Sequence, residues 1–329
     1  MKKVSIYRPA TVDEAIQILS QHGTQASVYA GGTDLLIRLK NRLEQAPSYL
    51  VDIKKIDHLR YIKEDAQGGV EIGAATKLAE LIDSPLLQHK YPMLVEAIGK
   101  ISSPELRNAS TLGGDLLQEV WCQYLRGGYP CWRNGGHICF GAIGDNSYYH
   151  SAMGGRLCYA VYPGDAATAL IPFDARAKLA TPQGVKELSI EQMVPGDMLV
   201  DGKIQSHVVR YNEILTSVVI PPPKPGVRAS FEKLRPRGVW DFAMASLGIS
   251  LQLRDKTIDD ARVVFGGIAG RPYREKAVEA FLKGKTLNAE LGEQAIAVAL
   301  TGAAPLKYNA TKIDMAKGLL ASGLARLNV

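Results

Sequence analysis

Two pairs of adjacent glycines, each following a run of small and apolar residues, constrain this 329-residue chain more than any other feature. The first lies in Val28-Tyr29-Ala30-Gly31-Gly32-Thr33-Asp34-Leu35, and the second in Ser110-Thr111-Leu112-Gly113-Gly114-Asp115. Adjacent glycines allow positive φ angles and let another group approach the backbone closely. Consecutive N–H groups in such a turn bind anions, and a following helix start adds positive potential. Both turns are therefore candidates to face a phosphorylated ligand.

Two common nucleotide-binding motifs are absent from the chain, which excludes two kinds of nucleotide-binding fold. Neither turn fits Gly-x-Gly-x-x-Gly and no Walker motif is present, so neither a Rossmann dinucleotide fold nor a P-loop is supported. Taken singly, each Gly-Gly is also consistent with a tight turn that serves only the fold. Two of them, with the Thr33 and Thr111 hydroxyls available to donate to phosphate oxygens, favour a dinucleotide.

The first glycine turn is expected at the centre of a β-α-β-type unit. Residues 11–22 and 35–41 show helical patterns, and residues 26–30 and 49–53 read as short strands. The run Pro221-Pro222-Pro223-Lys224-Pro225 is the best linker in the chain. We predict two domains, 1–220 and 226–329. Further strands are expected over 69–74, 178–188, 214–220, 230–234, 242–254 and 257–266. Further helices are expected over 77–82, 93–100, 166–170, 274–282, 289–300 and 313–327.

All four cysteines of the chain lie in one window, and this clustering requires an explanation. The cysteines are Cys122, Cys131, Cys139 and Cys158. Because no Cys-x-x-Cys pair occurs, a zinc ribbon, a thioredoxin motif and a ferredoxin-type run are not indicated. Ligation of a 4Fe–4S cluster across several loops fits the long intervals, with a Cys-4 zinc site or four inert buried cysteines as alternatives. The six histidines are dispersed, without metal-ligand spacing.

The cysteine segment, about residues 119–160, is rich in Gly, Tyr and Trp and is expected to be an ordered insertion in the first domain. The backbone N–H groups of Gly127-Gly128 and Gly135-Gly136 are candidates to bond the cluster sulfurs. Five aromatic residues are candidates to shield the site. They are Trp121, Tyr124, Tyr129, Trp132 and Phe140.

Charge and hydropathy exclude several classes of protein. The net charge is +6, but the basic residues are scattered without a Lys/Arg block, so nucleic-acid binding is not expected. No apolar run approaches the roughly 18 to 20 residues that span a bilayer. Residues after Met1-Lys2-Lys3 lack the apolar region of a signal peptide. We therefore expect a cytoplasmic protein, exported only if a partner subunit carries the signal.

Several motifs, taken in order, resemble one known family. They are Ala30-Gly31-Gly32-Thr33-Asp34-Leu35-Leu36, Ile72-Gly73-Ala74-Ala75-Thr76, Arg107-Asn108 through Gly113-Gly114-Asp115, and Pro163-Gly164-Asp165. Together they resemble the flavin subunit of the xanthine dehydrogenase family of molybdenum hydroxylases. The resemblance implies an α+β fold. Its first domain would be the FAD-binding domain shared with p-cresol methylhydroxylase, and its second would resemble the C-terminal domain of carbon monoxide dehydrogenase flavoproteins.

The resemblance also implies roles for individual residues. Val28 to Leu35 would wrap the FAD pyrophosphate, Ile101 and Ser102 would lie near the adenine, and Thr111, Gly114, Asp115 and Gln118 would line the ribose and phosphates. Asp165 would lie near the isoalloxazine ring, with Leu215 packed on the flavin and Lys233 at its mouth. Asp115 departs from the family pattern, because many relatives have Asn at that position.

By resemblance, a subset of the family carries an inserted 4Fe–4S cluster, typified by 4-hydroxybenzoyl-CoA reductase and certain bacterial aldehyde oxidoreductases. The implied function is transfer of electrons between the 2Fe–2S clusters of a small subunit and an external carrier, ferredoxin or NAD. A large subunit would hold molybdopterin and perform the substrate chemistry. Two alternatives remain at this point: a free-standing flavin oxidase or dehydrogenase, and a zinc-stabilised scaffold subunit without catalytic function.

Overall fold

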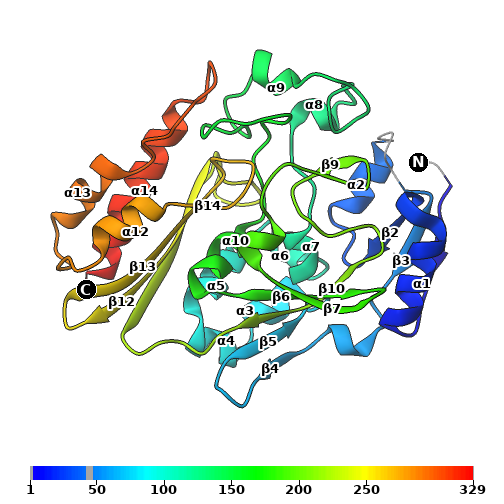
Figure 1. The fold of residues 1–329 in the computed structure, drawn as a ribbon, viewed down its shortest axis with the longest axis horizontal. Helices are drawn as coiled ribbons and strands as arrows, with labels where there is room; N and C mark the ends of the chain where they lie inside the picture. The colour runs from blue at the N-terminus through cyan, green and yellow to red at the C-terminus, as the bar shows by residue number, and fades with distance from the viewer. Residues whose placement is uncertain (1–2, 42–46, 329) are drawn as a thin grey trace.

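The computed structural model describes residues 3–41 and 47–328, and it begins with a small parallel sheet. Its strands β1 (Ser5–Tyr7), β3 (Tyr49–Asp52) and β2 (Ala26–Tyr29) lie in that order. Helix α1 (Val12–His22) packs on this sheet, and α2 (Leu35–Lys40) follows the first glycine turn (Figure 1). The predicted β-α-β unit is confirmed, with β1 as an additional strand.

A five-stranded antiparallel sheet forms the centre of the molecule. Its order is β4 (Ile62–Glu64), β5 (Val70–Gly73), β10 (Ile214–Ile220), β6 (Arg176–Thr181) and β7 (Gly184–Ser189). The single strand predicted over 178–188 is wrong, because the chain reverses at Pro182-Gln183 and Gly184 has a φ of 116°. Outside the cysteine segment, seven short helices lie along this part of the chain. They are α3 (Leu78–Ile82), α4 (Pro85–Lys90), α5 (Pro92–Gly99), α6 (Pro104–Arg107), α7 (Leu112–Leu116), α10 (Asp165–Leu170) and α11 (Ile190–Met193).

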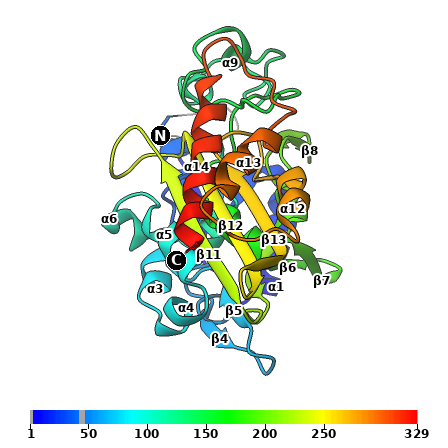
Figure 2. The same cartoon turned by 90° about the vertical axis from the view of Figure 1, so that its left-hand side faces the viewer.

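The C-terminal part is an antiparallel sheet covered on one face by helices. The strands are β11 (Val227–Leu234), β12 (Ala245–Arg254), β13 (Thr257–Gly266) and β14 (Tyr273–Arg274). Helices α12 (Lys276–Leu282), α13 (Leu291–Val298) and α14 (Thr311–Leu327) lie over it (Figure 2). The other face packs on the N-terminal part, since Phe231 and Val264 belong to the same buried cluster as residues of α5 and α10.

A small hairpin that we did not predict from the sequence lies between β7 and β10. It consists of β8 (Met198–Val200) and β9 (Lys203–Gln205). Both turn residues have positive φ angles, 49° at Asp201 and 78° at Gly202. This is the geometry that Asp-Gly favours in two-residue hairpin turns. The described residues also include three 3-10 turns. They are Gly23–Gln25, Asp57–Leu59 and Ile171–Phe173.

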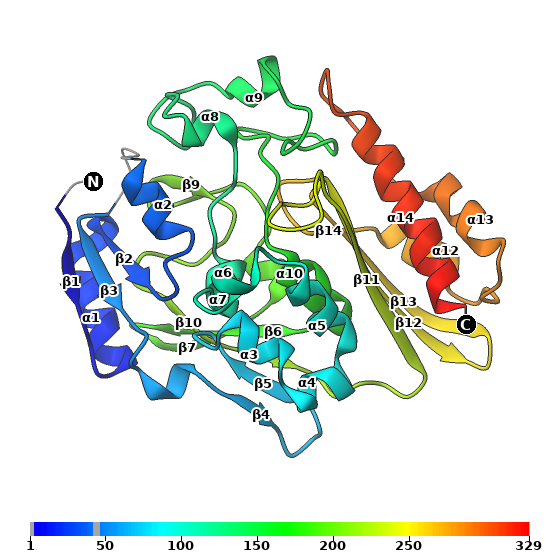
Figure 3. The same cartoon turned by 180° about the vertical axis from the view of Figure 1, so that it is seen from behind.

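The cysteine segment stands at one end of the molecule, above the two sheets in Figures 1 and 3. Its regular elements are α8 (Gln123–Arg126) and α9 (Phe140–Ile143), and the rest is loop. It reaches the C-terminal part near the start of α14, where Lys312 Nζ donates to the carbonyls of Tyr148 and His150. None of the helices within residues 3–41 and 47–328 is long and apolar enough to cross a bilayer.

Candidate functional site

The two glycine turns, about 80 residues apart in sequence, lie against each other. A Cβ added at Gly31 would lie 2.2 Å from the carbonyl oxygen of Ala109, so only glycine permits this approach. The Thr33 and Ser110 hydroxyls are 2.9 Å apart, and Gly32 has a φ of +73°. The second turn opens α7, where the Thr111 hydroxyl accepts a hydrogen bond from the Gly114 N–H. The turns therefore form one continuous backbone surface.

A pocket opens beside this surface and collects most of the predicted ligand residues. The predicted residues that line it are Val28, Ala30, Gly31, Gly32, Thr33, Asp34, Leu35, Thr111, Gly114, Gln118 and Leu215. Those outside the lining are Tyr29, Ile101, Ser102, Asp115, Asp165 and Lys233. Leu215 comes from β10, so the pocket lies between the small parallel sheet and the central sheet.

Asp165 and Lys233 form a buried ion pair outside the pocket lining. The Lys233 Nζ lies 2.6 Å from the Asp165 carboxylate, and the two side chains are only 1% and 5% exposed. Lys233 also donates to the carbonyl of Lys100, next to Ile101. The expectation for these two residues was Asp165 near the isoalloxazine ring and Lys233 at the mouth of the flavin site. The structure joins them to each other and to the carbonyl of Lys100.

Two other residues outside the lining, Asp115 and Tyr29, contact residues that line the pocket. The Asp115 carboxylate accepts hydrogen bonds from the Ala166 N–H (3.1 Å) and from Gln118 Nε2 (2.9 Å). Burial and the neighbouring Asp165 raise the pKa of Asp115 to about 7. The Tyr29 ring packs under Gly32 and lies 3.6 Å from the Lys54 ammonium.

The opposite wall of the pocket comes from residues 200–211, which sequence reasoning missed. It includes Ile204, Ser206 and His207. His207 contacts the Gln205 side chain through Nδ1 (3.2 Å), and burial lowers the pKa of His207 to about 4. The ring is thus neutral at physiological pH. The Asp201-Gly202 hairpin signal was the one indication of this wall in the sequence.

All four cysteines line a second, smaller cavity. The rest of its wall comes from Tyr124, Leu125, Trp132, Arg133, Phe140, Gly141 and Leu157. The cysteines are free thiols, three of them buried and Cys139 partly exposed. In the part of the chain that the structure describes, no group of three or more His, Cys, Asp or Glu side chains is arranged as ligands of a single metal ion. The four thiols thus surround one cavity, but they do not converge on a single position as the ligands of one metal ion would.

Backbone N–H groups face three of the sulfurs. Burial raises the pKa of the Cys122 thiol, while the Leu125 and Tyr124 N–H groups oppose that shift. The Arg133 and Asn134 N–H groups act in the same way on Cys131. The Ala160 N–H lies 3.4 Å from the Cys158 sulfur.

Three of the four glycines expected to face the cluster sulfurs bond to backbone carbonyls instead. Gly127, Gly128 and Gly136 donate to the carbonyls of Gln123, Leu125 and Cys131, not to sulfur. Of the aromatic residues expected to shield the site, Tyr124, Trp132 and Phe140 line the cavity. Tyr129 packs edge-on against Tyr124 and Phe140, and Trp121 packs on Phe242 outside the segment.

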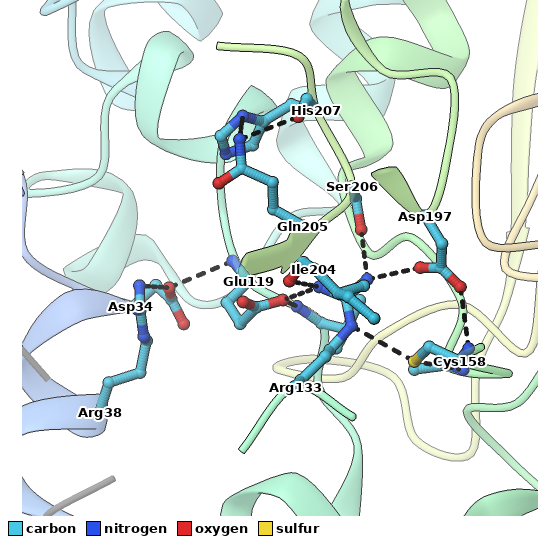
Figure 4. Close-up of polar contacts among 12 residues, drawn as sticks. Asp34, Arg38, Glu119, Arg133, Cys158, Asp197, Ile204, Gln205, Ser206 and His207 are labelled. Carbon is cyan, nitrogen blue, oxygen red and sulfur yellow. Dashed lines mark hydrogen bonds and ion pairs between the residues drawn. The ribbon is translucent and has the colours of Figure 1, made fainter. Parts of the chain in front are cut away.

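Two further side chains contact the cysteines. The His150 Nε2 lies 3.4 Å from the Cys122 sulfur, and burial lowers the pKa of His150 to about 4. The Arg133 Nε donates to the Cys158 sulfur at 3.3 Å, and the rest of the guanidinium reaches the wall of the large pocket (Figure 4). Sequence reasoning did not select Arg133, since a single arginine in a loop carries no recognisable signal.

Two family models match the chain. The FAD binding domain in molybdopterin dehydrogenase matches residues 2–223. The CO dehydrogenase flavoprotein C-terminal domain matches residues 229–323. The predicted α+β fold, with the first kind of domain followed by the second, is thereby confirmed.

Curated relatives match over most of their length. The chain is 31% identical to the aldehyde oxidoreductase FAD-binding subunit PaoB of Escherichia coli (strain K12), over 99% of this chain and 98% of the relative. It is 28% identical to the carbon monoxide dehydrogenase medium chain of Hydrogenophaga pseudoflava, over 89% of this chain and 85% of the relative.

Solved structures give the same result. A chain of the carbon monoxide dehydrogenase from Hydrogenophaga pseudoflava superimposes with a TM-score of 0.78 at 25% identity, covering 99% of this chain and 97% of that one. Quinoline 2-oxidoreductase from Pseudomonas putida 86, at 21% identity and a TM-score of 0.75, shares the fold. The chain is an oxidoreductase subunit that belongs to the FAD-binding medium subunits of the xanthine dehydrogenase and CO dehydrogenase family.

Proposed function

We propose that this chain is the electron-transfer subunit of a molybdenum hydroxylase or dehydrogenase, with FAD in the large pocket and a 4Fe–4S cluster on the four cysteines. The meeting of the two glycine turns at one pocket is the observation that carries the flavin part. The four thiols around one cavity carry the cluster part.

The pocket fits an FAD pyrophosphate because its backbone is accessible where the turns meet. We assign Val28, Tyr29, Ala30, Gly31, Gly32, Thr33, Asp34 and Leu35 to the pyrophosphate side. We assign Thr111, Gly114 and Gln118 to the ribose and phosphates, with Asp115 holding the second turn in place. Leu215 would pack on the isoalloxazine ring.

The buried ion pair leads us to revise one part of the assignment. Because Lys233 donates to the carbonyl of Lys100, we place Asp165 and Lys233 at the same end of the cofactor as Ile101 and Ser102. That end is the one we assign to adenine. An ion pair that is already satisfied internally suits a supporting role better than a direct contact with the flavin ring.

The cysteine cavity fits an iron–sulfur cluster by its donor set. In a 4Fe–4S cluster the thiolates of four cysteines surround the cluster, whereas the ligands of a zinc ion all approach one point at about 2.3 Å. Cys122, Cys131, Cys139 and Cys158 surround a cavity and therefore match the first arrangement. The N–H groups that face the sulfurs would stabilise thiolate charge, as outer hydrogen bonds do at metal sites.

A flavin supplies both two-electron and one-electron exchange, which suits a subunit between clusters and an external carrier. We propose that a partner subunit with 2Fe–2S clusters and a molybdopterin-binding large subunit complete the enzyme. Ferredoxin or NAD is the external partner that we propose. Cytoplasmic location and a domain boundary between residues 220 and 226 are part of the same proposal.

The cluster assignment is tested with single cysteine variants. Cys131→Ser and Cys139→Ser should each lower the iron content towards zero while FAD remains bound, because the two sites have separate linings. His137→Ala is the matched control, since His137 is exposed in the same segment and should leave iron unchanged. Full iron content in both serine variants would overturn the ligand assignment. Zinc in place of iron in the unaltered chain would favour the scaffold alternative.

A further inference from the structure

The buried guanidinium of Arg133 connects the cysteine cavity to the wall of the large pocket. We infer that Arg133 is a positioning residue that raises the reduction potential of the cluster and fixes it to the flavin site. This inference rests on the proposed cluster and goes beyond it, since it assigns a residue that neither binds iron nor lines the flavin pocket.

The geometry of Arg133 uses the whole guanidinium fork. Nε donates to the Cys158 sulfur at 3.3 Å. Nη1 donates to the Glu119 carboxylate at 2.7 Å and to the Ile204 carbonyl at 3.1 Å. Nη2 donates to Asp197 at 2.6 Å and to the Ser206 hydroxyl at 3.2 Å (Figure 4). The side chain is only 2% exposed, so these contacts are shielded from water.

The contact with Cys158 acts on the charge of the cluster. A reduced cluster carries one more negative charge than an oxidised one, so a positive group donating to a ligand sulfur stabilises the reduced form. Hydrogen bonds to the sulfurs and solvent exposure are among the properties that set cluster potentials. Low local dielectric strengthens this effect, since a buried charge interacts more strongly than an exposed one.

The remaining contacts lie on the flavin side. Glu119, Ile204 and Ser206 all line the large pocket. The Glu119 N–H also donates to Asp34 at the end of the first glycine turn, at 3.2 Å. The Arg133 side chain therefore connects a proposed cluster ligand directly to the wall of the proposed flavin site. Its planar, bidentate shape holds both sides in a fixed orientation, which lysine cannot reproduce.

Asp197 provides a test with the opposite sign. One carboxylate oxygen accepts from Arg133, and the other accepts from the Cys158 N–H at 3.2 Å. Its negative charge beside Cys158 disfavours the reduced cluster. Neutralising Asp197 should therefore raise the potential, whereas neutralising Arg133 should lower it.

The experiment is a redox titration of the purified protein loaded with FAD and iron. Electron paramagnetic resonance monitors the redox state of the cluster during the titration. Arg133→Gln should lower the midpoint potential of the cluster by at least about 59 mV. For a one-electron couple this corresponds to a tenfold change in the reduction equilibrium. Arg133→Lys keeps the positive charge, so its potential should lie between those of Arg133→Gln and the unaltered protein. Asp197→Asn should shift the potential upward. Arg156→Gln, at an exposed arginine of the same segment, is the control and should leave it unchanged.

The outcomes separate this inference from the cluster proposal. Absence of iron from the unaltered protein would contradict the cluster proposal itself. Iron-loaded variants with an unchanged potential would contradict the role of Arg133 alone. If Arg133→Gln does not retain iron, Arg133→Lys and Asp197→Asn decide the question: shifts of opposite sign support the inference, and shifts of the same sign overturn it.

Discussion

Single residues decide how closely the two glycine turns approach each other and a ligand. Gly31 packs against the backbone of Ala109, and Gly32 combines a positive φ with the close approach of the Tyr29 ring. No other residue type satisfies both requirements without backbone movement. Glycine at these positions was recognisable in the sequence, but the contact between the turns was not, because it joins residues about 80 positions apart.

Replacing Gly32 by alanine should weaken FAD binding at least tenfold. The new Cβ would lie 2.5 Å from the Tyr29 ring, and alanine would have to keep a φ of +73°. The backbone would have to shift away from the pyrophosphate. A tenfold loss of FAD affinity corresponds to about 1.4 kcal/mol of binding free energy. Flavin content after dialysis measures the effect. Gly99→Ala is the control, because a Cβ at Gly99 meets nothing within 4 Å. Equal flavin content in both variants would contradict the pyrophosphate assignment.

Asp115 should make folding stability depend on pH. Its pKa rises to about 7 in the folded chain through burial and the nearby Asp165. The folded protein therefore holds a proton that the unfolded chain releases near pH 4, so stability is lost as the pH rises from about 4 to about 7. The effect is on the order of 4 kcal/mol for a fully buried group.

Asp115→Asn removes this titration while keeping an acceptor for the Ala166 N–H. Chemical unfolding at pH 5 and pH 8 should show a smaller stability difference for Asp115→Asn than for the unaltered chain. An equal stability difference in the two proteins would mean that Asp115 is already ionised in the folded state at pH 5.

At the level of elements, the sequence predicted regular structure better than connections. The strands over 214–220 and 257–266 have the predicted bounds, since alternation and flanking turn residues define them locally. The hairpin β8–β9 and the reversal between β6 and β7 were missed, although Asp201-Gly202 and Pro182 to Gly184 are turn sequences. The part of the proposed flavin pocket that the glycine turns form was therefore predictable, and the wall from residues 200–211 was not.

The cysteine segment differs from the other elements because its position depends on distant polar groups. Lys312 at the start of α14 is fully buried and donates to the Tyr148 and His150 carbonyls. Asn309 donates to the carbonyls of His150 and Ser151. These contacts span about 160 residues, so local sequence patterns give no sign of them.

Lys312→Met should loosen the cysteine segment without unfolding the rest of the chain. The Tyr148 carbonyl loses its Lys312 donor and the His150 carbonyl keeps only the donor from Asn309, at a cost of about 2 kcal/mol. Hydrogen exchange should accelerate at residues 148–151 and remain slow in β12 and β13. Lys276→Met, at an exposed lysine on α12, should leave both regions as they are. Unchanged exchange at residues 148–151 would show that the segment is held by other contacts.

At the scale of the whole molecule, the N-terminal and C-terminal parts share a core. Phe231 and Val264 of the C-terminal sheet join the buried cluster around α5 and α10. Gly248 of β12 packs directly on α10, where an added Cβ would lie 2.3 Å from the Thr168 carbonyl oxygen. We therefore expect the two parts to unfold together.

Gly248→Ala tests this expectation. The added methyl should separate α10 from the sheet and lower the stability of both parts, by about 1–3 kcal/mol for an overpacked core. Calorimetry should show one unfolding transition at reduced temperature. Gly302→Ala, at an exposed glycine with open space around it, is the control. Two transitions, of which only one shifts, would contradict a shared core.

The central claim is that one chain carries both a flavin and an iron–sulfur cluster, each in its own cavity. The most direct measurement is the content of FAD, iron and acid-labile sulfide in the anaerobically purified chain, with its absorbance spectrum. The account predicts one FAD with about four irons and four sulfides per chain, giving flavin bands on a broad brown absorption. Yellow protein with FAD but no iron, or colourless protein that contains zinc, would contradict it.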